Sequence, residues 1–292
     1  MMWPRARIVT LMSLVLVAFA GNSLLCRLAL SQTGIDAGSF TATRLAAGAT
    51  ALVLIVRLRD GIVPTGGNWI SALVLVTYAI GFSFAYLALP AGTGALLLFG
   101  AVQVTMIGWG LWSGERLKWL QVLGLGAALT GLAGLLIPGI SAPPPMSAAM
   151  MLGAGIAWGV YSLRGRGSGD AVRATAGNFV RALPCAATLG FVSLPWASVD
   201  AAGLACAVAS GALASGVGYA IWYTALPQLS AISAATLQLS VPVIAAVGGI
   251  ALLGEVVTPR LMIASITVLG GVAVVIVAGR RAEDAGVDAN AL

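Results

Sequence analysis

The sequence predicts an all-α integral membrane protein in which ten transmembrane helices form two inverted five-helix repeats. Hydrophobic residues make up 60% of the 292 residues, only 8% are charged, and the mean hydropathy is +1.02. These values lie far outside the range of soluble domains. A bilayer-spanning helix needs about 20 apolar residues, and the chain offers ten windows of about that length. Such uninterrupted apolar runs indicate helices and not the alternating strands of a membrane barrel.

The ten windows are joined by short connections rich in Gly, Pro, Ser and Asp, which favour turns. In order, they are 8–29, 36–57, 68–89, 92–113, 119–138, 146–164, 172–193, 202–225, 230–253 and 258–279. The first follows a basic N-terminus and resembles a signal peptide, but it continues apolar through Leu30, so we expect a retained helix. We expect residues 1–140 to form the first repeat, 146–279 the second, and 280–292 a polar, disordered cytoplasmic tail.

A duplicated motif supports the division into two repeats. The sequence Tyr-x-Ala-Leu-Pro, followed at the end of the next span by Gly-Glu, occurs at Tyr86–Pro90 with Gly114-Glu115, and again at Tyr223–Pro227 with Gly254-Glu255. Arg44 and Arg181 are separated by the same offset as the two tyrosines. Because each copy has an odd number of spans, the second copy must cross the membrane upside down, an arrangement typical of secondary transporters.

The distribution of basic residues predicts the orientation. Most Lys and Arg residues fall on the side shared by the N-terminus and the even-numbered loops, and the exceptions are Arg27, Arg44, Arg181 and Arg260. Cytoplasmic loops carry such an excess, so we expect both termini in the cytoplasm. The pI of about 9.8 is explained by these loops, and we expect no nucleic-acid partner.

The chain lacks the side chains that several functional classes require. The chain has no histidine, its three cysteines are unpaired in spacing, and all nine acidic residues lie in loops, span ends or the tail. We therefore expect no catalytic residues, no metal site, no cofactor and no enzymatic activity. A mid-membrane carboxylate is typical of proton relays and cation sites. Its absence argues against a cation antiporter of the small multidrug type and favours a substrate that is neutral overall.

Aromatic and amide side chains mark the candidate substrate cavity. Tyr78, Phe82 and Tyr86 recur every four residues and share one helix face. A buried amide without a partner is costly, so the Asn and Gln residues should face the protein interior or a wet cavity. Ordinary packing is the alternative for the aromatic residues. The full candidate set is Asn22, Tyr78, Phe82, Tyr86, Phe99, Gln103, Trp158, Tyr161, Tyr219, Trp222, Tyr223 and Gln238.

For the arginines and glycines inside the spans, structural roles are the favoured interpretation. Arg44 and Arg181 lie about two turns into their helices; either they face an anionic substrate group, or, as we favour, they bridge backbone carbonyls or extend to the interface. Glycines in the fifth and tenth spans should allow these two helices to pack closely at the seam between the repeats. Pro242 is expected to break the ninth span.

The ordered, duplicated motifs resemble the EamA-type members of the drug/metabolite transporter superfamily. The placements Trp158-x-x-Tyr161 and Tyr219-x-x-Trp222 are similar to those of YddG-type amino-acid exporters, although the first span has Ala20-Gly21 where the family carries Trp-Gly. The resemblance implies a multi-pass protein of the bacterial inner membrane, monomeric or homodimeric.

Its expected function is export of aromatic and other neutral amino acids by alternating access through a central cavity between the repeats. A nucleotide-sugar or phosphorylated-metabolite antiporter and a broad drug or metabolite efflux protein remain alternatives. A phosphate site would need a deep basic cluster, and the only lysine, Lys118, lies in a loop. A membrane receptor without transport activity would need a soluble domain or long loops, for which few residues remain.

Overall fold

The computed structural model describes residues 5–61, 66–114, 117–139, 142–165, 169–225 and 237–289. Within these ranges all regular secondary structure is helical, and eight helices are long and apolar enough to cross a membrane. They are α1 (Arg5–Gln32), α2 (Ala37–Asp60), α4 (Ala91–Trp112), α5 (Trp119–Leu136), α6 (Pro145–Gly165), α7 (Ala171–Ser193, extended by η1, Leu194–Trp196), the continuous segment α8 (Ala201–Val208), η2 (Ala209–Val217) and α9 (Gly218–Ala225), and α12 (Pro259–Ala289). Two shorter apolar helices, α3 (Trp69–Ala85) and α11 (Ser240–Leu253), complete the set. The prediction of an all-α protein with ten apolar helices is confirmed for this part of the chain.

Three helices differ from the expected bounds. α3 ends at Ala85, four residues early, because the Tyr86–Pro90 segment turns toward α4. α11 begins at Ser240, after an interruption at Leu239 that follows the helical residues Leu237 and Gln238, so the helix is broken just before Pro242, which lies in the first turn of α11. The first part of the expected span, residues 230–236, lies outside the described residues. α12 continues to Ala289, through part of the segment expected to be a disordered tail; Arg, Ala and Glu in this segment favour helix.

Polar N-caps explain why acidic residues lie at helix ends. The side chains of Asp36, Asn68, Asp170 and Asp200 each accept a hydrogen bond from the backbone N–H three residues on, at 2.9–3.1 Å. Such caps satisfy donors that the helix leaves free and place negative charge at the positive end of its dipole.

Asp36 also accepts from the backbone N–H of Ser198 at 3.1 Å, which joins the start of α2 to the segment before α8. Burial acts to raise the pKa of the Asp36 carboxyl, but the hydrogen bonds from Ser39 and Ser198 outweigh it and leave that pKa below the ordinary value of aspartate.

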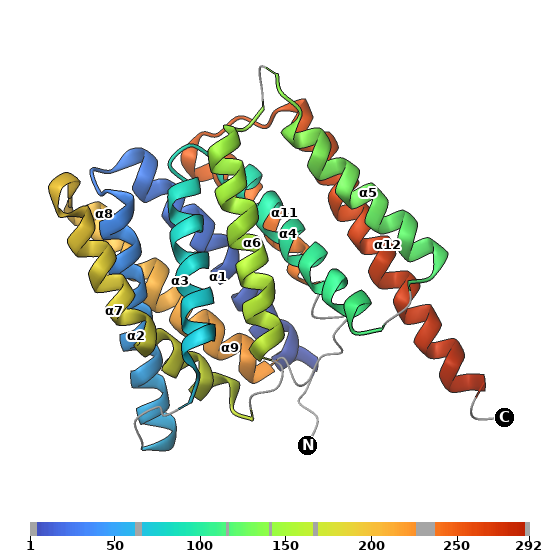
Figure 1. Ribbon diagram of the computed structural model, residues 1–292, viewed down its shortest axis with the longest axis horizontal. Helices are drawn as coiled ribbons and strands as arrows, with labels where there is room; N and C mark the ends of the chain where they lie inside the picture. The colour runs from blue at the N-terminus through green and yellow to red at the C-terminus, as the bar shows by residue number, and fades with distance from the viewer. Residues whose placement is uncertain are drawn as a thin grey trace.

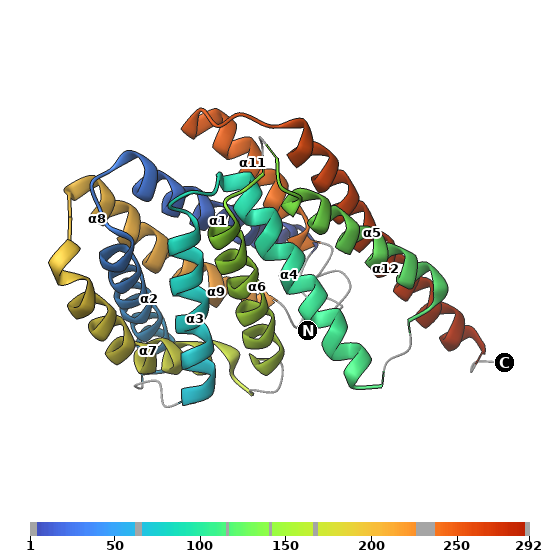
Figure 2. The same ribbon diagram turned by 45° about the horizontal axis from the view of Figure 1, so that its top comes forward.

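Helices of the two halves of the chain pack against each other in pairs. α2 packs on α7, α3 on α6, α4 on α11, α5 on α12, and α1 on η2 and α9. Figures 1 and 2 show α5 and α12 side by side at one edge of the bundle, while α2, α7 and α8 form the opposite edge. The start of α1 and the end of α12 lie on the same, lower side in Figure 1.

The expected close packing of the fifth and tenth spans is present. A Cβ atom on Gly124 of α5 would lie 2.5 Å from the carbonyl oxygen of Gly271 in α12, and a Cβ atom on Gly271 would collide with the carbonyl oxygen of Gly124. The two backbones are so close that neither residue has room for a side chain. Gly126 and Gly270, by contrast, have open space beside them.

We expect Gly124→Ala to lower the free energy of unfolding by about 1–3 kcal/mol, because the new methyl group forces the backbones of α5 and α12 apart. Gly126→Ala is the matched control, and it should leave stability unchanged or raise it by up to about 1 kcal/mol through helix propensity. Thermal unfolding of both variants in detergent micelles measures the difference. Equal stabilities would contradict the assigned contact.

Candidate functional site

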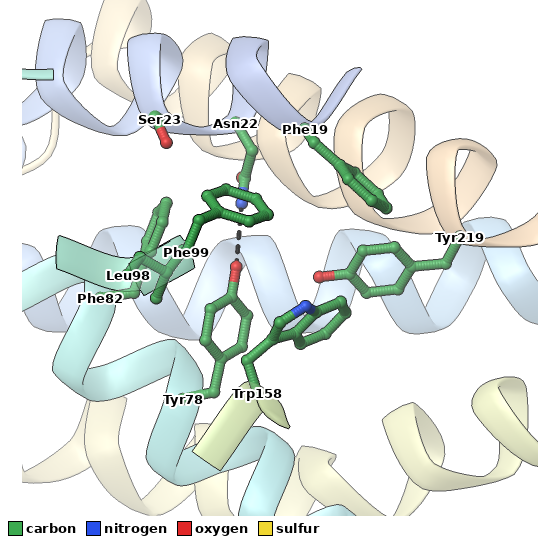
Figure 3. Close-up of a pocket in the computed structure, with 9 residues that line it drawn as sticks. All are labelled: Phe19, Asn22, Ser23, Tyr78, Phe82, Leu98, Phe99, Trp158 and Tyr219. Atoms are coloured by element: carbon green, nitrogen blue, oxygen red, sulfur yellow. Dashed lines mark hydrogen bonds between the residues drawn. The ribbon is translucent and has the colours of Figure 1, made fainter. Parts of the chain in front are cut away.

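An aromatic cavity lies inside the bundle between α1, α3, α4, α6 and α9. Nine described residues line it, namely Phe19, Asn22, Ser23, Tyr78, Phe82, Leu98, Phe99, Trp158 and Tyr219 (Figure 3). All nine are uncharged. Six of them belong to the set expected from the sequence, and three, Phe19, Ser23 and Leu98, do not. We call these nine residues the central cavity.

Helical spacing accounts for the side chains contributed by α1 and α3. Phe19, Asn22 and Ser23 stand three and four residues apart, which places them on one face of α1. Tyr78 and Phe82 are one turn apart on α3, and their ring centroids are 5.4 Å apart. The same spacing rule, applied backward from Asn22, would have identified Phe19.

Asn22 is held from both sides. Its Nδ2 donates to the hydroxyl oxygen of Tyr78 at 3.2 Å, and its Oδ1 accepts from the hydroxyl of Ser210 in η2 at 2.6 Å. All three side chains are buried. Because an unpaired amide inside an apolar bundle is costly, these bonds fix α1, α3 and η2 relative to one another at the level of the cavity.

Trp158 is the centre of the aromatic cluster. Its ring centroid lies 4.9 Å from those of Tyr78 and Tyr219, and the ring stacks on Tyr161 at 5.5 Å. Figure 3 shows the hydroxyl groups of Tyr78 and Tyr219 and the indole nitrogen of Trp158 pointing toward the same space. The free volume of the central cavity is only about 20 Å³, which is room for about one water molecule. In this conformation the rings are closed on one another.

A larger, polar hollow of about 230 Å³ lies at one end of the bundle, where α3 and α7 begin and α6 and α9 end. Tyr161 and Tyr223 line it, and the hydroxyl of Tyr161 accepts from Nδ2 of Asn178 at 3.2 Å. Arg164 donates to the Ser71 hydroxyl at 3.0 Å at the same hollow. Since Tyr161 lines the hollow and Trp158 lines the central cavity, their stacked rings separate the two spaces.

Four residues of the expected set lie elsewhere among the described residues. The Tyr86 ring packs on Gly94 and its hydroxyl donates to the carbonyl of Ala91 at 3.3 Å. Trp222 is buried against Phe19, with ring centroids 5.8 Å apart. Gln103 is buried within α4 and Gln238 is half-buried just before α11, and the two belong to neither lining.

At the opposite end of the bundle, Glu255 joins α1 to the start of α4. Its Oε1 lies 3.1 Å from Nε of Arg27, and its Oε2 accepts from the backbone N–H of Ala91 at 2.8 Å. Nη1 of Arg27 donates to the carbonyl oxygens of Tyr86 and Leu87 at 3.0 and 3.2 Å. The Gly-Glu motif that follows α11 therefore binds the Tyr-x-Ala-Leu-Pro turn between α3 and α4. The residues at the corresponding positions of the other half, Glu115 and Pro227, lie outside the described residues.

A second ion-pair network joins α2 to α7 at the end that bears the polar hollow. Asp60 accepts from Nη2 of Arg59 and from Nε of Arg173, both at 2.8 Å, and Asp170 pairs with the same two arginines. These ion pairs lie near solvent, so each contributes little singly, but four charges form a connected group.

Arg181 and Arg44 occupy different environments. Nη1 of Arg181 donates to the carbonyl oxygens of Gly66 and Gly177 at 2.6 and 3.0 Å, which is the structural role we favoured from the sequence. The guanidinium of Arg44 is buried, with its central carbon 4.8 Å from the ring centroid of Phe82 and 5.6 Å from that of Tyr78.

Comparison with known proteins places this architecture in a family. Residues 145–277 match the EamA-like transporter family. The chain is 54% identical over 274 residues to an uncharacterized Pseudomonas aeruginosa protein, PA1977, covering 94% of this chain and 96% of that protein. It is 29% identical over 204 residues to a probable terminal-alkyne amino-acid exporter of Streptantibioticus cattleyicolor, covering 67% of each. A solved crystal structure shares the fold, with a TM-score of 0.65, 17% identity, and coverage of 95% of this chain and 100% of that one.

The apolar helices and these matches define a multi-pass membrane transporter. The chain belongs to the EamA-like transporter family of the drug/metabolite transporter superfamily, which is a family of transporters and not of enzymes. The resemblance that the duplicated motifs indicated is confirmed.

We expect Glu255→Gln to loosen the closed end, because Arg27 loses its ion pair while the amide can still accept from Ala91. Cys26, which is fully buried next to Arg27, serves as a native reporter in a C185A/C206A background. Its modification by N-ethylmaleimide should become several-fold faster in E255Q. Asp60→Asn, which disrupts the network at the other end, is the control and should not accelerate it. Unchanged modification in E255Q would show that Glu255 does not close this end.

Proposed function

We propose that this protein is a secondary transporter of the bacterial inner membrane that exports amino acids with aromatic or bulky apolar side chains. The observation that carries the proposal is the central cavity, which combines three aromatic rings around Trp158, those of Phe19, Tyr78 and Tyr219, with the hydrogen-bonded amide of Asn22. Ligand sites typically pair apolar walls with a few fixed polar groups of this kind. The Streptantibioticus relative, named a probable amino-acid exporter, supports the same substrate class.

The helix pairing supports alternating access between two inverted repeats. Exchange of the two halves replaces the first span by the sixth, the second by the seventh, and so on. Under this exchange the packed pairs α2–α7, α4–α11 and α5–α12 are unchanged. The pair α3–α6 is replaced by the eighth span packed on α1, which is also observed. Packing of this symmetry lets one half rock against the other.

The two ends of the bundle differ in a way that fits one state of this cycle. The Glu255 end is closed by an ion pair, whereas the opposite end contains the polar hollow of about 230 Å³. That opposite end also carries Arg57, Arg59, Arg164 and Arg173, which favours a cytoplasmic location for it. We interpret the conformation as closed outward, with the hollow as the cytoplasmic approach to the cavity.

A phosphorylated-metabolite antiporter is the weaker alternative. Such a substrate would need at least two cationic side chains to neutralise a phosphate group. Arg181 donates to backbone carbonyls. Of the two arginines at equivalent positions, Arg44 alone is therefore left to bind a phosphate group.

Reconstitution into liposomes tests the proposal. We expect flux of labelled phenylalanine and leucine across the membrane that is inhibited by other neutral amino acids, and no flux of a sugar phosphate. Empty liposomes are the control for leakage. Flux of the sugar phosphate without flux of any amino acid would refute the proposal in favour of the antiporter.

Within that assay, Trp158→Ala should raise the KM for phenylalanine about two- to tenfold, because contacts between aromatic rings are worth about 0.5–1.5 kcal/mol. The KM for alanine should change less, since alanine has no ring to stack. Trp196→Ala is the matched control, because Trp196 is 76% exposed in η1 at the end of α7 and is not part of the cavity lining. Equal effects of the two substitutions would remove Trp158 from the binding site.

A further inference from the structure

Arg44 is a buried cation without a counter-charge in the described part of the chain. Its residue is only 3% exposed, none of the ion pairs among the described residues includes it, and its Nη1 atom has no hydrogen-bond partner. A charged group at such depth in a membrane protein is costly unless it is paired, and it typically marks a functional site.

The contrast with Arg181 removes the simplest structural explanation. Arg181 stands at the same offset in the second half of the chain, and both carbonyls that it bridges are backbone groups. Arg44 makes no equivalent bridge through Nη1. The two arginines occupy equivalent positions in the sequence but have different partners, and Nη1 of Arg44 remains free to donate a hydrogen bond.

The surroundings of Arg44 hold the guanidinium in place without consuming all its donors. The rings of Phe82 and Tyr78, which wall the central cavity, lie 4.8 and 5.6 Å from its central carbon. Cation–π contact of this kind positions the planar group by its face. The N–H groups at the edge of the plane remain the donors that recognise a ligand.

Two further buried polar atoms are also without hydrogen-bond partners, and one of them belongs to a residue of the central cavity. The hydroxyl oxygens of Ser23, which lines the central cavity, and of Ser215 in η2 are buried and make no hydrogen bond in the described structure. η2 packs directly on α2, where Gly211 lies against the backbone of Arg44 so closely that a Cβ there would collide with the Arg44 carbonyl. η2 is a π-helix, a distortion that is frequent at functional sites.

The buried Nη1 of Arg44, behind the Tyr78 and Phe82 rings, lacks an acceptor, and a negatively charged acceptor would also neutralise the guanidinium. A carboxylate has two acceptor oxygens and no donor, and it matches the planar fork of a guanidinium. We propose that Arg44, assisted by the Ser23 hydroxyl at the cavity wall, binds the carboxylate of the transported amino acid, while the aromatic rings contact its side chain. This inference rests on the proposed function. Because the central cavity holds only about 20 Å³ of free space, binding requires the Tyr78 and Phe82 rings to separate and uncover the guanidinium.

Binding to purified protein, read through quenching of tryptophan fluorescence, tests the inference apart from transport. Phenylalanine should bind at least about tenfold more tightly than phenylalaninamide, and phenylpropionate more tightly than phenylpropanamide, because the carboxylate offers the guanidinium a negative charge and a second acceptor oxygen. Arg44→Gln should abolish this preference for the acid. Ser23→Ala should reduce it less.

Arg181→Gln is the matched control, and it should keep the preference for the carboxylate while lowering the melting temperature, since two backbone carbonyls lose their donor. Arg44→Gln should leave the melting temperature unchanged or raise it, because it removes an unpaired buried charge. Loss of folding in R44Q would show a structural role and overturn the inference, as would equal binding of acid and amide by the wild type. Absence of amino-acid flux in liposomes refutes the proposed export instead, and the binding preference remains measurable.

Discussion

The carboxylate of Glu255 joins three parts of the chain that are far apart in sequence. One oxygen pairs with Arg27 of α1 and the other accepts the first free N–H of α4, while Arg27 binds the carbonyls of the turn after α3. Helix ends leave such groups unsatisfied, and in a bilayer no water is present to satisfy them at depth. The Gly-Glu motif supplies a carboxylate, and the Tyr-x-Ala-Leu-Pro turn and the start of α4 supply backbone groups without helical partners. Glu255 and Arg27 together satisfy these groups, so the two motifs lie in contact. This contact also holds α1, α4 and the turn after α3 together at one end of the bundle.

The same constraint organises the interior. Asn22 has a partner on each side of its amide, and Asn178 supports Tyr161 at the polar hollow. These amides are satisfied by residues from other helices, so the packing of the bundle and the polar network depend on each other. Arg44, Ser23 and Ser215 are exceptions to this pattern. Natural proteins leave few buried polar atoms without partners, and here two of the three exceptions, Ser23 and Arg44, lie at the central cavity or against its walls.

Much of the architecture was predictable because membrane helices carry strong local signals. Ten apolar helices, the polar N-caps that begin several of them, and the small residues between the fifth and tenth spans all follow from composition and spacing. Of the aromatic stripe of α3, Tyr78 and Phe82 line the central cavity. Tyr86 does not, because α3 ends at Ala85 and the turn directs this side chain onto Gly94. Periodicity holds only as long as the helix that produces it.

Apolar length, charge distribution and the repeated motifs were sufficient to identify a multi-spanning membrane transporter, since these properties act within single segments. The partners of buried polar groups could not be identified from the sequence, because they come from helices more than 50 residues away, as for Asn22 with Tyr78 and with Ser210. The two arginines show the difference most clearly. Their positions in the sequence are equivalent, and only the packing of neighbouring helices satisfies Arg181 with backbone carbonyls while it leaves Arg44 beside the cavity with a free donor.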